Sequence, residues 1–189
     1  MPSRGRASAS PARKSRKRSP AVKQAELQGI LTEFAGDRVA LLERHEAGAR
    51  AVSHYDFNNA YQYVINREEM QLAWLQTALA ELGAALPAPS GTIALPDVQK
   101  VSQKGDSAAF RGIFEDDGRQ LAEFVGRWRP RVAAMTHARH RIMLDVILGE
   151  SREHQRIFDQ AAAGMEDLLG KRTGGVVRQG AVLPVRWME

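Results

Sequence analysis

Apolar residues recur along most of the chain at alternating steps near three and four, the spacing of amphipathic α-helices. A period-two alternation, the mark of a strand, is almost absent. The pattern predicts four long helices: residues 21–50, a second from a polar interruption at 51–56 to Gly83, a third that starts near an N-cap at Asp106, and a fourth from a turn at 136–140 to Gly170.

The connections between these helices differ in length. The first and third joints are short, which makes the first two helices one antiparallel pair and the last two another. Residues 84–105, rich in proline and glycine turns, form a connection of about 20 residues, which at ~3.3 Å each can span the whole length of a bundle. The sequence therefore predicts one long crossover, with an up-down-up-down bundle as the alternative.

The ends of the chain differ from its middle. Residues 1–20 are rich in Ser, Pro and like charges, a composition typical of disorder, and residues 171–189 have no helical period. We therefore divide the chain into a disordered basic arm (1–20), a helical bundle (21–170) and an irregular C-terminal tail (171–189).

Composition narrows the classes of protein. No run approaches 18 apolar residues, which argues against a transmembrane helix, and no apolar segment near the start resembles a secretory signal. The absence of cysteine excludes disulfides, thiolate zinc sites and cysteine nucleophiles, and it fits a cytoplasmic protein. The Arg- and Ser-rich start, which lacks acids, also suits a mitochondrial transit peptide.

Polar residues interrupt the apolar stripe of every predicted helix. Unpaired buried carboxylates are costly and repel one another, and a shared cation such as iron or manganese relieves both costs. The alternative is that the true apolar stripe of each helix lies one residue away from the predicted one. The acids are then exposed to solvent and need no cation. The residues are Asp37 and its neighbour Glu33 in the first helix, Glu68 and Gln71 in the second, Asp117 in the third, and Glu150, Ser151 and His154 in the fourth.

Two segments carry a resemblance to a known family. "NREEMQLAWLQTALAELGAALP" and "MLDVILGESREHQRIF" resemble the Glu-x-x-His helices of the ferritin-like superfamily of di-iron carboxylate proteins. The resemblance covers about residues 25–170 and implies an all-α, ferritin-like four-helix bundle with one long crossover between helices two and three. The chain departs from the family pattern at Gln71, where the family has His, and at Ser151, where it has Glu.

Two interpretations of these stripes stay open, and the sequence does not decide whether the protein is an enzyme. In the first, a remodelled site binds one iron or manganese ion and reacts with dioxygen or peroxide, through Glu68, Asp117, Glu150 and His154, with Asp37 or Glu33 assisting. In the second, no metal is bound, and a hydrogen-bond network fixes the register of the bundle, through Glu68, Gln71, Ser151 and His154.

The basic arm offers a different kind of function. Residues 1–20 hold seven Lys and Arg and no acid, so the net charge of +5 leaves about −2 for the rest of the chain. Such an arm suits a nucleic acid backbone, although an acidic protein, anionic lipid or organelle targeting fits the same composition. We also expect a homo-oligomer, with "VLPVRWME" docking on a partner or second subunit. The candidate nucleic-acid contacts are Arg13, Lys14, Arg16, Lys17 and Arg18.

Overall fold

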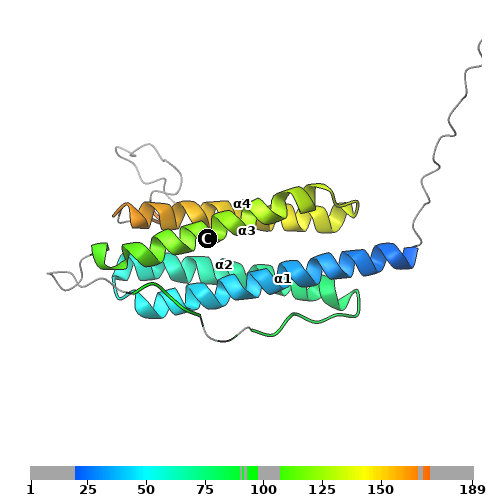
Figure 1. Cartoon of the computed structure of the whole chain (residues 1–189), viewed down its shortest axis with the longest axis horizontal. Coiled ribbons are helices and arrows are strands. Elements are labelled where there is room, and N and C mark those ends of the chain that lie inside the picture. Colours follow the sequence, from blue (N-terminus) through cyan, green and yellow to red (C-terminus); the bar gives the residue numbers. More distant parts are fainter. Residues whose placement is uncertain (1–19, 90, 92, 98–106, 166–167, 171–189) are drawn as a thin grey trace, which may run out of the picture.

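The computed structural model describes residues 20–89, 91, 93–97, 107–165 and 168–170, and this part of the chain is an all-α four-helix bundle, as predicted (Figure 1). The expected arm before Pro20, the N-cap at Asp106 and the tail at 171–189 lie outside the described residues. The elements are α1 (Pro20–Ala51), α2 (Tyr55–Ala80), the 3₁₀ turn η1 (Ser107–Phe110), α3 (Arg111–Ala133) and α4 (Ala138–Ala162).

Two glycines explain where α2 and α4 end. Gly83 has φ +74° and Gly164 has φ +76°, a left-handed conformation that costs glycine little and commonly closes a helix. The N–H of the next residue then bonds back to the helix, from Ala84 to the Leu79 carbonyl and from Met165 to the Gln160 carbonyl. The predicted stop at Gly83 is confirmed, whereas α4 ends eight residues before the predicted Gly170.

Contacts between the helices fix their directions. The α1–α2 and α3–α4 pairs are antiparallel hairpins, and α1 also packs antiparallel to α3, with Glu33 paired to Arg131 and Arg44 to Asp117. The α2–α4 contact is antiparallel too. It follows that α2 and α3 run in the same direction, and α1 and α4 in the other (Figure 1).

The described part of the connection between α2 and α3 follows α1. Pro87 lies against Gly36, the Gly91 N–H donates to Glu43, and the Ala94 carbonyl accepts from Arg44. The connection thus runs along the bundle in the direction of α1, from the end where α2 stops toward the end where α3 begins (Figure 1).

Aromatic side chains fill the bundle interior in two groups. Toward the start of α1, Phe34 packs edge-on against Phe124 and Trp128, at centroid distances of 5.1 and 4.9 Å. Toward its end the second group comprises Phe57, Tyr61, Phe114 and Phe158, with neighbouring centroids 4.9–6.1 Å apart. Between the two groups several polar and charged side chains are buried among the aliphatic ones, which is unusual for a bundle core.

No helix among the described residues is long and apolar enough to cross a membrane.

Candidate functional site

Polar residues at the middle of the bundle replace apolar ones on the buried stripe of each helix. Five of them, Glu68, Gln71, Asp117, Ser151 and His154, were predicted to be buried, and all are at most 1% exposed. Arg38 and His45 from α1 join them and are fully buried as well. We call the following six residues the core cluster: Arg38, His45, Glu68, Gln71, Ser151 and His154.

The carboxylate of Glu68 is the centre of the core cluster. His45 Nδ1 lies 2.8 Å from Oε1 and 2.9 Å from Oε2, so the imidazole faces both oxygens. Arg38 Nη2 forms an ion pair with Oε1 at 3.1 Å, and His154 Nδ1 lies 3.8 Å from the same oxygen. A buried carboxylate therefore has a buried guanidinium as its counter-ion, supplied by the neighbouring helix.

The guanidinium of Arg38 reaches across the bundle to α4. Its Nη1 donates to the Ser151 hydroxyl at 3.4 Å, and its Cζ lies 5.7 Å from the centroid of the Phe124 ring. Ser151 in turn donates to the Ile147 carbonyl at 2.8 Å. Arg38 Nε has no hydrogen-bond partner among the described residues. The charge of the guanidinium is thus matched by the Glu68 carboxylate, but not all of its N–H groups have hydrogen-bond acceptors.

Asp117 belongs to a second ion pair beside the core cluster. Arg44 Nε donates to its Oδ1 at 2.6 Å, and the Tyr61 hydroxyl donates to Oδ2. Arg44 also pairs with Asp116 at the edge of the bundle. The two fully buried carboxylates, Glu68 and Asp117, are therefore each matched by an arginine of α1.

These surroundings shift the pKa values of the buried groups. Burial alone raises the pKa of Glu68, but the charges of His45 and Arg38 outweigh burial and hold it well below its ordinary 4.5. Burial lowers the pKa of His154 from 6.5, with Glu68 opposing. Burial also raises the pKa of Asp117 from 3.8, although His45, Tyr61 and Arg44 act to lower it. Glu68 is thus an anion at neutral pH, and the neutral form of His154 is favoured.

Three further residues of the predicted site lie at the edge of the bundle. Glu150, partly exposed, accepts from Arg67 and Gln71, and these bonds outweigh its burial and lower its pKa. Asp37 accepts from Trp128 Nε1 at 2.6 Å and pairs with Arg127 at the α1–α3 surface. Glu33 is exposed and makes a bidentate pair with Arg131 at 2.6 Å.

The structure thus separates the five predicted metal ligands. Glu68 and His154 come together, whereas Asp37, Asp117 and Glu150 each bond to a different arginine. Within the described residues, no group of three or more His, Asp or Glu side chains is arranged to hold a metal ion. The single-metal site over all five residues stays a prediction. Of the predicted hydrogen-bond network, Glu68 and Ser151 are linked only through Arg38, and Gln71 bonds to Glu150.

Sequence reasoning missed Arg38 and His45. It placed Asp37 on the stripe. The buried positions of α1, with Val52 just after the helix, instead include a four-three repeat that passes through Arg38 and His45. A shift of one residue turns a helix by ~100°, which moves Asp37 to the surface. The buried positions that show the repeat are Leu27, Leu31, Phe34, Arg38, Leu41, His45, Gly48 and Val52.

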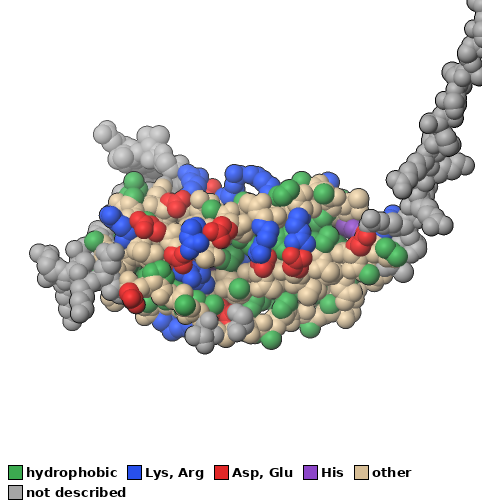
Figure 2. Space-filling view, viewed as in Figure 1, with side chains coloured by type: hydrophobic (Ala, Val, Ile, Leu, Met, Phe, Trp, Pro, Cys, Tyr) green, Lys and Arg blue, Asp and Glu red, His purple; other side chains and the backbone are tan. Residues whose placement is uncertain are grey.

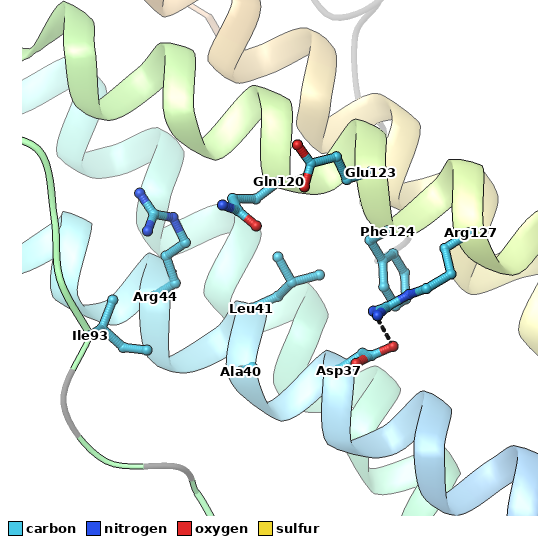
Figure 3. Close-up of a pocket in the computed structure, with 9 residues that line it drawn as sticks. All are labelled: Asp37, Ala40, Leu41, Arg44, Ile93, Gln120, Glu123, Phe124 and Arg127. Carbon is cyan, nitrogen blue, oxygen red and sulfur yellow. Dashed lines mark ion pairs between the residues drawn. The ribbon is translucent and has the colours of Figure 1, made fainter.

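A surface hollow of about 530 Å³ lies between α1, α3 and the connection (Figure 3). Leu41 and Phe124 line it, with Ile93 of the connection on one side. Its two arginines already have protein partners, since Arg127 pairs with Asp37 and Arg44 with the acids of α3. The hollow therefore offers apolar contact and no free guanidinium.

Basic side chains (Lys or Arg) and acidic side chains lie beside one another on the face shown in Figure 2. Ion pairs also join α1 to α3, among them Arg131 with Glu33 and Arg127 with Asp37. Positive charge is therefore not gathered into one patch on this face.

The chain matches no family model, no curated protein and no solved structure.

Proposed function

We propose that this protein is a non-enzymatic four-helix bundle of the ferritin-like kind, whose basic N-terminal arm binds nucleic acid. The proposal has three parts, which are the bundle class, the absence of catalysis and the partner of the arm.

The ferritin-like class is supported by the helix directions. Parallel α2 and α3, joined by a connection that runs along α1, match a bundle with one long crossover, the arrangement of ferritin-like proteins. Glu68 and His154, which stand at ligand positions in the resemblance, also meet at the bundle centre. An up-down-up-down bundle would instead make α2 and α3 antiparallel.

The non-enzymatic character rests on how the interior charges are used. Glu68, Asp117 and His154 are at most 1% exposed, so a substrate has no route to them in this conformation. Glu68 and Asp117 are also held by Arg38 and Arg44. Groups engaged in this way stabilise a fold rather than attack or protonate a ligand.

The partner of the arm follows from the distribution of charge, and this observation carries the proposal. Seven cations and no acids lie in residues 1–20, while the remainder of the chain has a net charge of about −2. Binding of a nucleic acid to the arm is favourable, because each contact between a cation and a phosphate releases condensed counterions. The rest of the chain has a net negative charge, which repels phosphates. The nucleic acid should therefore contact mainly the arm.

Fluorescence anisotropy with a short labelled DNA duplex tests the proposal. The full chain should bind with an affinity that falls steeply with salt, with a log–log slope of up to about −6 for seven phosphate contacts. Replacing five arm residues by Gln should reduce that slope by about 4 to 5 units. The five residues are Arg13, Lys14, Arg16, Lys17 and Arg18.

A charge change on the bundle supplies the control. Arg119→Gln removes an exposed cation of α3, which lies among acids of its own helix, and should leave the slope unchanged. DNA binding that survives the five arm substitutions, or no binding by the full chain at low salt, would refute the proposed partner.

A further inference from the structure

Three nitrogen atoms from three side chains converge on one carboxylate oxygen. Around Glu68 Oε1 lie His45 Nδ1 at 2.8 Å, Arg38 Nη2 at 3.1 Å and His154 Nδ1 at 3.8 Å. All four side chains are at most 2% exposed. Two of the nitrogens belong to imidazoles and one to a permanent cation.

Without Arg38, the other three groups have the ligand types of a metal site, although the described structure does not arrange them as one. Nitrogen and oxygen ligands bind divalent ions at about 2.0–2.2 Å, so neighbouring ligand atoms lie roughly 3–3.5 Å apart. The imidazole nitrogens stand 2.8 and 3.8 Å from Oε1, on either side of that range. His154 Nδ1 is buried and makes no hydrogen bond within the described part of the chain.

As they stand, these residues do not fit the metal that the ferritin-like resemblance implies. The guanidinium of Arg38 lies against the oxygen that an ion would need, and its charge repels a divalent cation. His45 Nδ1 is already engaged with both oxygens of Glu68. Arg38 itself is held loosely, since its Nε is unpaired and its bond to Ser151 is long, at 3.4 Å.

We propose that the guanidinium of Arg38 occupies a cation site built from His45, Glu68 and His154, and that it excludes divalent metal ions from the wild-type bundle. Removing the Arg38 side chain opens a two-histidine, one-carboxylate set, which suits first-row divalent ions such as Fe²⁺, Mn²⁺ and Co²⁺. The proposal concerns the bundle interior and holds whether or not the arm binds nucleic acid.

Titration of the full chain with Co²⁺ tests this directly, because the visible absorption of the ion reports its ligand geometry. Arg38→Ala should take up one Co²⁺ per chain at least about 100-fold more tightly than wild type. Adding His154→Phe to Arg38→Ala should abolish the absorption, and Arg38→Lys, which keeps a cation, should bind no better than wild type. Equal Co²⁺ binding by wild type, or none by Arg38→Ala, would overturn the proposal.

Arg38→Ala leaves Glu68 without the guanidinium that pairs with it, which destabilises the variant. If it unfolds during the Co²⁺ titration, the effect of Co²⁺ on its melting temperature is measured instead. Added Co²⁺ should raise the melting temperature of Arg38→Ala and leave that of Arg38→Ala/Glu68→Gln, which removes the charge, unchanged. A metal response that is equal in both variants, or missing in both, would contradict the proposed site.

Discussion

The ion pair between Arg38 and Glu68 is buried in the bundle core, and Arg38→Met tests how much it stabilises the fold. Both side chains are 0% exposed and lie 3.1 Å apart, so the carboxylate of Glu68 is out of contact with bulk solvent when the guanidinium is lost. Removing one partner of a buried pair costs about 3–5 kcal/mol, because the other charge stays desolvated. For a protein of 189 residues this corresponds to a fall in Tm of roughly 6–20 °C.

The double variant Arg38→Met/Glu68→Gln distinguishes an unpaired charge from lost packing. Its Gln can still bond to His45, and no uncompensated charge remains, so its stability should lie within about 2 kcal/mol of wild type. Arg139→Met is the matched control. Arg139 makes a bidentate pair with Glu81 at 2.9 Å, but the two side chains are 72% and 43% exposed, and losing such a pair costs at most about 1 kcal/mol.

Urea unfolding followed by far-UV circular dichroism measures these differences. The reasoning fails if Arg38→Met costs less than about 1 kcal/mol, as a surface pair does. It also fails if the double variant is as unstable as the sum of the two single variants, since the two positions would then be independent.

Further predictions concern packing and pH. A Cβ on Gly48 would lie 2.7 Å from the Tyr61 ring, so Gly48→Ala should lower the free energy of unfolding in urea by about 1–3 kcal/mol. Gly29 has open space around it, so Gly29→Ala should raise the free energy of unfolding by up to about 1 kcal/mol. Because the folded pKa of His154 lies below 6.5, the unfolded chain binds more protons there, and stability should fall as the pH drops through that value. A second loss should begin below 4.5, where Glu68 is protonated only in the unfolded chain. In urea midpoints measured against pH, His154→Gln should reduce the first loss and leave the second, and the rest of the first loss comes from His140, whose pKa is also lowered from 6.5 by burial.

Much of the fold could be predicted from the spacing of apolar residues. Four helices, two hairpins and the stop at Gly83 follow from local rules of period and capping. The end of α4 could not be placed as well, because the apolar period continues through Met165 and Leu168 after Gly164 has already turned the chain out of the helix. A lone glycine in a periodic segment indicates a stop only weakly.

The site was predicted in part, and the error has a physical origin. Glu68, Asp117 and His154 were placed correctly because each sits between large apolar residues at helical spacing. In α1 the sequence analysis placed Asp37 on the stripe, whereas the next residue, Arg38, is the buried one. Arginine is among the residues least often buried, so composition favoured the wrong phase, and only its partner on another helix shows why it is inside.

Charge balance explains why that partner could not be deduced from one helix at a time. Glu68 in α2 and Asp117 in α3 each look like costly isolated acids within their own helix. Arg38 and Arg44, both from α1, supply one counter-ion to each. Predicting such pairs requires knowing which helices lie next to each other. The spacing of residues within one helix does not give that information.

The central claim is that Arg38, and not a metal ion, neutralises Glu68 in the bundle core. The most direct measurement is the metal content of the full-length protein, purified from cells grown with added iron and manganese, together with its melting temperature before and after treatment with a chelator. The account predicts no stoichiometric iron or manganese and an unchanged melting temperature. One metal ion per chain, whose removal lowers the melting temperature and whose binding is lost in His154→Phe, would contradict it.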